Sequence, residues 1–373
     1  MKAKIREYAK ELGIDAIGFA DGEPLFETRE FLAKMKEEGF LSEFVKDDLD
    51  QICNPRMVMK GANTVIVCAI SYKIDDPKVE EERMRANKEL RARLSRFAWG
   101  KDYHRVLGEK LDRLIDFLEK EFEEFKGVKF VDNGPTVDRA LARKAGIGWQ
   151  GKNCSIINQD YGSWIFLGGI ITNLDLETDE PVENRCGECR RCIEACPTGA
   201  LVDDYTLDSR KCLGYITLSK GHIPRKYRKK MGNRLWGCDT CQDVCPHNKK
   251  TKAGNHKEFK PGELGAYPEL APLLAMSNKG YKKKFMPTPM NWRGKRPIQR
   301  NAAIILGNLR KEESLPHLIE ALKDPKPIVR GSAVWAIGQI GSQRALDALE
   351  KALIKENDEK VREEIRQVLS TKR

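Results

Sequence analysis

Cysteines are the residues of this chain whose spacing most directly predicts chemistry. Eight of the eleven cysteines lie between Cys186 and Pro246. The first four follow the C-x2-C-x2-C-x3-C-P spacing of proteins that hold two [4Fe–4S] clusters, in which three close thiolates bind one cluster and the cysteine before proline binds the other. We therefore predict two sets of ligands: Cys186, Cys189, Cys192 and Cys245 for one cluster, and Cys196, Cys212, Cys238 and Cys241 for the other.

A zinc site or disulfides would use the same residue type. Zinc prefers two C-x2-C pairs that close one tetrahedral site, and the cysteines before Pro197 and Pro246 do not suit that arrangement. Disulfides need an oxidising compartment, whereas residues 1–13 are charged and do not resemble a signal peptide. We therefore expect a soluble cytoplasmic protein in which the two clusters conduct electrons. The remaining cysteines are interpreted as buried small hydrophobes: Cys53, Cys68 and Cys154.

Basic residues are concentrated in two segments that contain no acidic residue. The formal net charge is +11, and nine Lys or Arg lie in each of the segments 209–238 and 277–310. The second segment also contains Tyr281, Phe285 and Trp292. Cationic segments with interleaved aromatic rings favour nucleic acid, because they attract phosphates and offer faces for base stacking. A solvated surface face is the alternative.

Three regions must position these residues. Residues 1–175 alternate helical and strand patterns, with strands expected at 15–21, 63–72, 128–131, 154–158 and 163–172 and helices at 2–12, 23–39, 80–97, 103–125 and 136–144. This pattern predicts an α/β domain. Residues 176–260 form the ferredoxin-like cluster domain. Residues 261–373 contain repeated helical segments in which Arg300, Arg330 and Arg362 recur 30 and 32 residues apart, as in stacked HEAT-type repeats.

Three further motifs lie in the first region. The G-x-G-x-x-G match at 146–151 follows a helix, whereas a dinucleotide-binding turn follows a strand, so that interpretation is rejected. The segment Asp102-Tyr-His104 is close to a cobalt-binding DxHxxG motif, but Asp102 is better explained as a helix N-cap. Asp132 follows a strand, so it is either a turn residue or a carboxyl at the end of a sheet strand, where catalytic groups often lie.

Taken together, these residues resemble one family, the epoxyqueuosine reductases. The resemblance extends over essentially the whole chain and rests on the eight cysteines and on five further segments: 98–104, 131–135, 138–153, 162–167 and 292–301. It implies base-off cobalamin in a domain akin to reductive dehalogenases, besides two [4Fe–4S] clusters. The implied reaction removes the epoxide oxygen of epoxyqueuosine as water, at the tRNA wobble position. An external low-potential electron donor would supply the electrons. The sequence leaves the oligomeric state open, and a monomer is the default expectation.

The resemblance also implies roles for particular residues. Asp132 would be the proton donor, and an aspartate acting as an acid near neutral pH needs a raised pKa, which burial against a corrin face would provide. Besides Asp132, the cobalamin contacts would include Lys152, Asn153 and Asp239. The basic segments would then hold the phosphates of the anticodon stem-loop. The expected tRNA contacts are Lys220, Lys282, Lys283, Lys284, Arg293, Lys295, Arg296 and Arg300.

Three rival interpretations remain open from the sequence. One is an iron–sulfur electron-transfer module without catalysis, and another is a repeat scaffold that binds RNA and holds structural clusters. The third is another cobalamin-dependent reductase, such as a dehalogenase, which would leave the basic segments and the helical repeats without a purpose.

Overall fold

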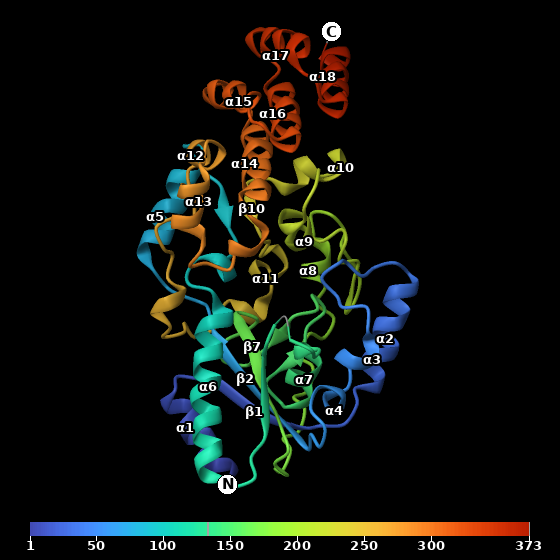
Figure 1. The fold of residues 1–373 in the computed structure, drawn as a ribbon, viewed down its shortest axis with the longest axis vertical. Helices are drawn as coiled ribbons and strands as arrows, with labels where there is room; N and C mark the ends of the chain where they lie inside the picture. Colours follow the sequence, from blue (N-terminus) through green and yellow to red (C-terminus); the bar gives the residue numbers. More distant parts are fainter. Residues whose placement is uncertain (133, 373) are drawn as a thin grey trace. The chain divides into compact units, whose positions relative to one another are not determined.

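The computed structural model describes residues 1–132 and 134–372, which divide into two compact units (Figure 1). Unit 1 consists of Met1–Asp75, Lys101–Cys212 and Thr240–Lys260, and unit 2 of Asp76–Gly100, Leu213–Asp239 and Pro261–Arg373. Each unit is therefore built from three separate stretches of the chain. The boundaries expected near residues 175 and 260 separate regions with different predicted functions, whereas the two units are defined by how compactly the chain packs. These boundaries stay a prediction.

A four-stranded sheet forms the centre of unit 1. Its strand order is β1 (Ala16–Asp21), β2 (Thr64–Ser71), β7 (Ile165–Thr172) and β4 (Gly127–Val131). All three pairings are antiparallel. Every residue of β2 is buried, in agreement with its run of β-branched side chains, which favour a strand packed on both faces.

Helices pack against both faces of this sheet (Figure 1). The long helix α6 (Tyr103–Glu121) contacts β4, β7 and the helix α1 (Lys2–Glu11). Its leucines at i, i+4, i+7 and i+11 are fully buried: Leu107, Leu111, Leu114 and Leu118. Helix α7 (Asp138–Lys144) contacts β1, β2 and β7 and packs on a separate hydrophobic cluster. The remaining helices of this part are α2 (Phe26–Glu37), α3 (Leu49–Ile52) and α4 (Pro55–Val58).

Two glycines let the central strands approach closely. A Cβ on Gly169 of β7 would lie 2.2 Å from the carbonyl oxygen of Ile66 and 2.8 Å from the ring of Phe130. A Cβ on Gly168 would lie 2.8 Å from the carbonyl oxygen of Phe130. These contacts are shorter than any side chain tolerates, so the glycines fix how β7 packs between β2 and β4, and with it the position of the loop that follows β4.

The cysteine-rich part of unit 1 consists of short elements held by turns. Strands β5 (Trp149–Gln150) and β6 (Ile156–Ile157) pair with each other, as do β8 (Leu201–Asp203) and β9 (Thr206–Leu207). Two one-turn helices follow cysteines, α8 (Arg191–Glu194) and α11 (Thr240–Asp243). The strand expected at 154–158 is thus confirmed only as the two residues of β6.

Unit 2 begins with a segment that differs from its sequence-based prediction. A single charged helix was expected over 80–97, but α5 (Pro77–Ala86) ends at Ala86 and β3 (Arg93–Leu94) pairs in parallel with β10 (Arg234–Trp236). Ala92 and Leu94 are buried in the core of the unit, so tertiary packing outweighs the helical pattern. The other elements before the repeats are α9 (Leu213–Leu218) and α10 (Arg225–Arg228).

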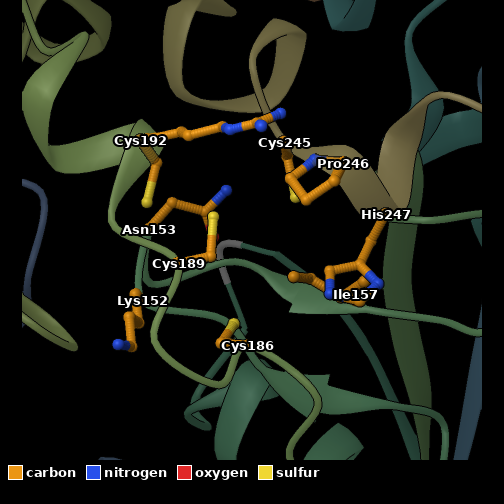
Figure 2. Close-up of a pocket in the computed structure, with 10 residues that line it drawn as sticks. Lys152, Asn153, Ile157, Cys186, Cys189, Cys192, Cys245, Pro246 and His247 are labelled. Carbon is orange, nitrogen blue, oxygen red and sulfur yellow. The ribbon is translucent and has the colours of Figure 1, made fainter.

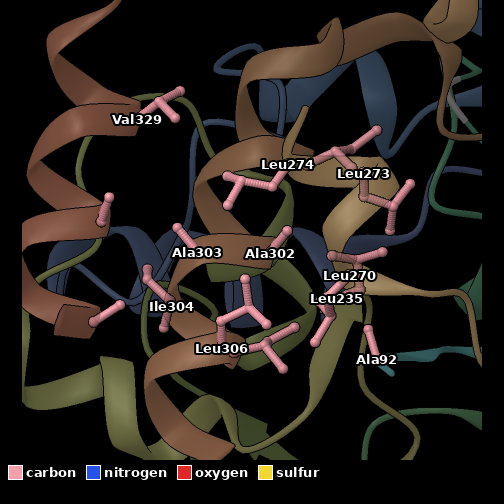
Figure 3. Close-up of a cluster of buried hydrophobic side chains, with 14 of the residues drawn as sticks. Ala92, Leu235, Leu270, Leu273, Leu274, Ala302, Ala303, Ile304, Leu306 and Val329 are labelled. Carbon is pink, nitrogen blue, oxygen red and sulfur yellow. The ribbon is translucent and has the colours of Figure 1, made fainter. Parts of the chain in front are cut away.

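The C-terminal part of unit 2 is helical throughout, as predicted. Helices α14 (Lys295–Leu309), α16 (Pro327–Ile340) and α18 (Glu359–Lys372) pack in sequence, with α15 (Leu315–Ala321) and α17 (Gln343–Lys355) between them along the chain. Two helices precede this stack, α12 (Leu270–Leu274) and α13 (Asn278–Phe285). One continuous core joins α12, α14 and α16 to β10, and Figure 3 shows its leucine, isoleucine and alanine side chains interdigitating. Within the described residues, no helix is long and apolar enough to cross a membrane.

Candidate active site and iron–sulfur centres

One pocket of unit 1 brings together the first predicted set of four cysteines. Cys186, Cys189 and Cys192 line it from one segment and Cys245 from another, more than fifty residues along the chain. Figure 2 shows these four side chains around one space, together with Asn153 and His247. The turn from Cys186 to Cys189 is closed by a backbone hydrogen bond of 3.1 Å and contains Gly187 at φ 50°. The structure therefore groups these cysteines as the sequence predicted.

The second predicted set is divided between the units. Cys196 and Cys241 pack into one cluster with the buried Cys154 in unit 1, where Cys212 also lies. Cys238 belongs to unit 2. The Sγ of Cys196 accepts a hydrogen bond of 3.2 Å from the backbone N–H of Ala200. Although burial opposes it, such backbone hydrogen bonds lower the pKa of Cys196, and the thiolate form they favour is the one that binds iron.

The three remaining cysteines behave as buried thiols. Burial raises the pKa of Cys53 and of Cys154 to about 11, and that of Cys68 to about 12. None of the eleven cysteines forms a disulfide within the described part of the chain. Cys154 differs from the other two because it packs against Cys192 and Cys196 in the cysteine-rich part.

The surroundings of the first cysteine set fit an iron–sulfur cluster. Asn153 lines the pocket, is 6% exposed, and its Nδ2 has no hydrogen-bond partner in the described structure. The Nε1 of Trp149, which packs against Cys245, is likewise buried without a partner. A buried N–H group without a partner is costly, and hydrogen bonds to cluster sulfur atoms would satisfy it. Four thiolates and two donors of this kind suit a cluster of inorganic sulfide and iron.

Asp132 lies at the end of β4, and α6 supplies its neighbours. Its Oδ2 accepts a hydrogen bond from the hydroxyl of Tyr103 and lies 3.6 Å from Nε2 of His104. The Nδ1 of His104 lies 2.7 Å from Oδ1 of Asp102, which also caps the N-terminus of α6. The Asp132 side chain is 57% exposed and its backbone has φ 49°, a conformation that is uncommon for a residue other than glycine. The carboxylate is thus presented to solvent by a constrained turn.

Neighbouring groups of α6 set the pKa of Asp132. Partial burial would raise the pKa of Asp132, but the nearby His104 imidazolium and the hydrogen bond from Tyr103 outweigh burial and hold the pKa below its ordinary value. A raised pKa was expected for a proton donor. The opposite shift is found for the neighbours: Asp102 and Asp132 overcome burial and raise the pKa of His104 to about 9. At neutral pH the proton therefore resides on His104 and Asp132 is a carboxylate.

Asp138 is a second titrating carboxyl in the same region. It is the first residue of α7 and accepts a hydrogen bond of 2.9 Å from the hydroxyl of Thr136 at Oδ1, while its Oδ2 is buried without a partner among the described residues. Burial and then the charge of Asp132 raise the pKa of Asp138 to about 8. Neither Asp138 nor the role of Tyr103 was singled out from the sequence. Both could have been noticed in the sequence as polar residues, Asp138 in the segment after β4 and Tyr103 at the start of α6.

The residues expected to contact cobalamin lie in both units. In unit 1, Lys152 is buried and its Nζ lies 2.9 Å from Oδ2 of Asp204. In unit 2, Asp239 is 3% exposed, and its carboxylate accepts hydrogen bonds from Ser95 Oγ at 2.5 Å and from the backbone N–H of Arg96 at 2.9 Å. Asp132 offers an exposed carboxylate and Asn153 an amide Nδ2 without a partner in the described structure, so these two fit a large polar ligand such as a corrin with its amide side chains.

The basic residues expected to contact tRNA separate into exposed and engaged groups. Lys220, Lys282 and Lys283 are exposed. Arg300 is 0% exposed, and its guanidinium donates hydrogen bonds to the backbone carbonyls of Ser219 and Gly221 at 2.7 and 2.6 Å, and to two further carbonyls. The prediction that Arg300 contacts a phosphate is therefore wrong for this structure, because the side chain is structural.

Other residues of the second basic segment have partners within unit 2. Lys295 donates from Nζ to the carbonyl of Met276 at 2.9 Å, and Arg296 pairs with Asp324 at 2.9 Å. Lys284 lies 3.6 Å from Glu263. The guanidinium of Arg293 lies 4.0 Å from the ring centroid of Trp292, which is 53% exposed. Of the aromatic residues singled out in this segment, Tyr281 and Phe285 are buried in the core, which leaves Trp292 as the exposed ring of the three.

Comparison with known proteins identifies the family. The model "Epoxyqueuosine reductase QueG, DUF1730" matches residues 53–133, the model "4Fe-4S double cluster binding domain" residues 185–248, and the HEAT repeat model residues 294–370. The epoxyqueuosine reductases of Bacillus anthracis and Bacillus subtilis are 41% and 42% identical to this chain, each over 98% of it and over 96% and 94% of their own lengths. The chain belongs to the epoxyqueuosine reductase family.

Solved structures agree with this membership. An epoxyqueuosine reductase in complex with an epoxyqueuosine-modified tRNA-Tyr stem loop matches with a TM-score of 0.94 and 42% identity, covering 100% of this chain and 98% of that chain. Another structure, from Bacillus subtilis, matches with the same TM-score at 41% identity and has its catalytic aspartate loop swung out of the active site. As a member of the epoxyqueuosine reductase family, the chain is an oxidoreductase with a double-cluster domain and HEAT repeats. The fold class predicted from the sequence is confirmed: an α+β multi-domain protein with an α/β domain, a ferredoxin-like cluster domain and helical repeats.

Proposed function

We propose that this chain reduces epoxyqueuosine to queuosine at the wobble position of tRNA, with Asp132 delivering protons to the epoxide oxygen. Conversion of that oxygen into water requires two electrons and two protons. The observation that carries the proposal is the exposed carboxylate of Asp132, held at the end of β4 by Tyr103 and His104. The homologous Bacillus subtilis enzyme has a catalytic loop that carries an aspartate, which supports this assignment.

The cysteines would hold the two clusters through which electrons enter. The first set is assembled in the pocket of unit 1, and its fit to a [4Fe–4S] cluster rests on the buried, unpaired N–H groups of Asn153 and Trp149. Base-off cobalamin would be held by Asp132, Lys152, Asn153 and Asp239. When bound, it would supply low-potential electrons to the epoxide. An external low-potential donor is needed to reload the clusters.

The protein's own contribution to the chemistry is acid catalysis and substrate positioning. As the epoxide opens, negative charge develops on its oxygen, and a carboxyl held in place stabilises that charge by transferring a proton. General acid catalysis of this kind contributes roughly 10²–10⁴-fold to rate. For tRNA, the exposed lysines Lys220, Lys282 and Lys283 and the neighbouring Arg293 would contact phosphates. Arg300 is not among these contacts, and Lys284, Lys295 and Arg296 already have partners within unit 2.

The substitution Asp132→Asn tests this function. It removes the acidic proton and keeps the shape of the side chain, so anaerobic turnover of epoxyqueuosine-containing tRNA should fall by about 10²–10⁴-fold. Nucleoside mass spectrometry measures product, and iron, sulfide and corrin content should remain at wild-type levels. Asp116→Asn is the matched control, because Asp116 is exposed on α6 of the same unit.

The outcomes separate the rival functions. Wild-type turnover in Asp132→Asn would remove Asp132 from the mechanism. A wild-type protein that holds clusters but no corrin and makes no queuosine would be an electron-transfer module. Binding of tRNA without any redox turnover would instead indicate an RNA-binding scaffold. Release of halide from a halogenated aromatic, with no product from tRNA, would indicate a dehalogenase.

A further inference from the structure

His104 and Asp102 form a chain of titrating groups that ends at Asp132 and that the proposed function does not use. We propose that His104 is a positioning residue that stores a proton for the reaction and passes it to Asp132, with Asp102 fixing its orientation. The proposal rests on the proposed role of Asp132 and deepens it. It was not evident from the sequence, where His104 was weighed only as a cobalt ligand.

The stoichiometry of the reaction requires such a store. Two protons must reach one oxygen, and a single carboxyl carries only one at a time. The pKa of Asp132 is held below its ordinary value by its neighbours, so in the described state even the first proton must come from another group. Asp132 therefore needs a proton source within reach, placed so that it recharges the carboxyl between the two transfers.

The geometry places His104 in that position. Asp102 Oδ1 lies 2.7 Å from Nδ1 of His104 and accepts its hydrogen bond, so the other ring nitrogen, Nε2, carries the mobile proton. That nitrogen lies 3.6 Å from Oδ2 of Asp132, slightly beyond hydrogen-bond length. A shift of well under 1 Å in the turn that presents Asp132 is enough to close this gap. The ring is held by stacking on Tyr103, with centroids 4.1 Å apart.

The surrounding charges keep His104 protonated. Burial would lower its pKa, but Asp102 and Asp132 outweigh burial and raise the pKa to about 9. The other titrating groups around Asp132 are Tyr103, whose pKa burial raises well above its ordinary value, and Asp138, whose pKa burial raises to about 8. The positive charge of Arg139 stabilises the carboxylate of Asp132 and lowers its pKa. Asp138 is therefore the competing proton source, and the experiment must distinguish it from His104.

The proton moves from His104 to the substrate oxygen in two steps. The Nε2–H bond of the imidazolium breaks as an O–H bond forms on Asp132, and that O–H bond then breaks as the proton reaches the substrate oxygen. Both protons pass from His104 through Asp132 to the substrate oxygen, His104 is reprotonated between the two transfers, and two electrons from the external low-potential donor complete the conversion of the epoxide oxygen into water. His104 is left neutral and regains its proton from solvent, to which 30% of its side chain is exposed.

The pH profile of His104→Gln tests this role in the cofactor-loaded enzyme. Wild-type single-turnover rates with epoxyqueuosine tRNA should stay level until the pH approaches the pKa of about 9 and then fall. In His104→Gln the decline should begin below pH 7, with a loss of roughly 10²-fold at pH 8 and a much smaller loss at pH 6. His317→Gln, an exposed histidine on α15, is the matched control and should follow the wild type.

Two further measurements separate storage of a proton from a structural role. Added imidazole should restore rate to His104→Ala, because it replaces the missing acid. Histidine ring NMR should place the titration of His104 near pH 9 and show it moving toward 6.5 in Asp132→Asn and in Asp102→Asn. This shift is observable without turnover, so it tests the pairing even if the proposed function fails.

The proposal is overturned by any of three results. The first is a pH-independent loss in His104→Gln without rescue by imidazole, which would indicate a structural role. The second is an ordinary titration of His104 that Asp132→Asn leaves unchanged. The third is an altered pH profile in Asp138→Asn with a normal one in His104→Gln, which would assign the stored proton to Asp138.

Discussion

At the scale of single residues, the cysteine pocket offers a direct comparison between a predicted ligand and a neighbouring thiol. Cys245 lines the pocket with three other cysteines, whereas Cys154 packs against Cys192 and Cys196 and does not line that pocket. Burial raises the pKa of both thiols, so position in the pocket distinguishes the predicted ligand. Cys245→Ala should therefore lose about half of the iron and sulfide of the anaerobically reconstituted protein, since one of two [4Fe–4S] clusters is affected.

Cys154→Ala is the control for this prediction. It removes a buried sulfur of similar surroundings, so iron and sulfide content should stay at the wild-type level while stability falls slightly. Electron paramagnetic resonance of the reduced proteins should show one cluster signal in Cys245→Ala and two interacting signals in Cys154→Ala. Equal iron loss in both variants would contradict the ligand assignment.

Residue-level prediction from sequence succeeds where chemistry depends on spacing and fails where it depends on distant neighbours. The first cysteine set could be grouped in advance because cluster geometry imposes the spacing of its ligands. The state of Asp132 could not, because its pKa depends on Tyr103 and His104, which approach it from another element. The expected raised pKa assumed burial against a corrin face, and these two residues act on the pKa in the opposite direction.

At the scale of elements, the buried Arg300 links the first repeat helix to the basic segment that precedes it. Its guanidinium donates to four backbone carbonyls between Ile216 and Gly221. Burial lowers its pKa to about 9, which still leaves it charged at pH 7. Each buried acceptor left without a partner costs roughly 1–3 kcal/mol. Arg300→Met should therefore lower the free energy of unfolding by about 3 kcal/mol or more, measured by denaturant titration.

Arg310→Met is the comparison for that substitution. Arg310 caps the C-terminal end of the same helix and is exposed, so its replacement should change stability by less than about 0.5 kcal/mol. If Arg300→Met unfolds at the same denaturant concentration as the wild type, the guanidinium is not what joins these elements.

The repeated arginines show why sequence reasoning misjudged this element. Their recurrence correctly predicted stacked helices, but a repeat position is defined by its packing rather than by exposure. Arg300 is buried, and Arg330 pairs with Glu356 at 2.7 Å. In these two repeats the arginine is therefore engaged within the protein. The helix expected over 80–97 failed for a related reason, because Arg93–Leu94 pairs with a strand more than 130 residues away. Neither burial nor partner can be read from local periodicity.

At the scale of the whole molecule, the net charge of +11 is not equally available to a polyanion. Lys282 is exposed on α13, whereas Arg296 pairs with Asp324 although both basic residues lie in the same acid-free segment. A basic residue already neutralised within the protein releases few counterions when RNA binds. The total charge therefore overstates the number of phosphate contacts, and residues of one segment should differ in their contribution to affinity.

Salt-dependent binding measures that difference directly. The anticodon stem-loop should bind Lys282→Ala with a shallower slope of log K against log salt, by about one phosphate's share of roughly 0.7–0.9. Arg296→Ala should keep the wild-type slope and instead lower the melting temperature, because it leaves Asp324 without its partner. Fluorescence anisotropy between 50 and 200 mM salt, on the full chain, provides the slopes. An equally shallow slope in Arg296→Ala would show that RNA competes with Asp324 for this guanidinium, and the internal pairing would then be a feature of the unbound protein alone.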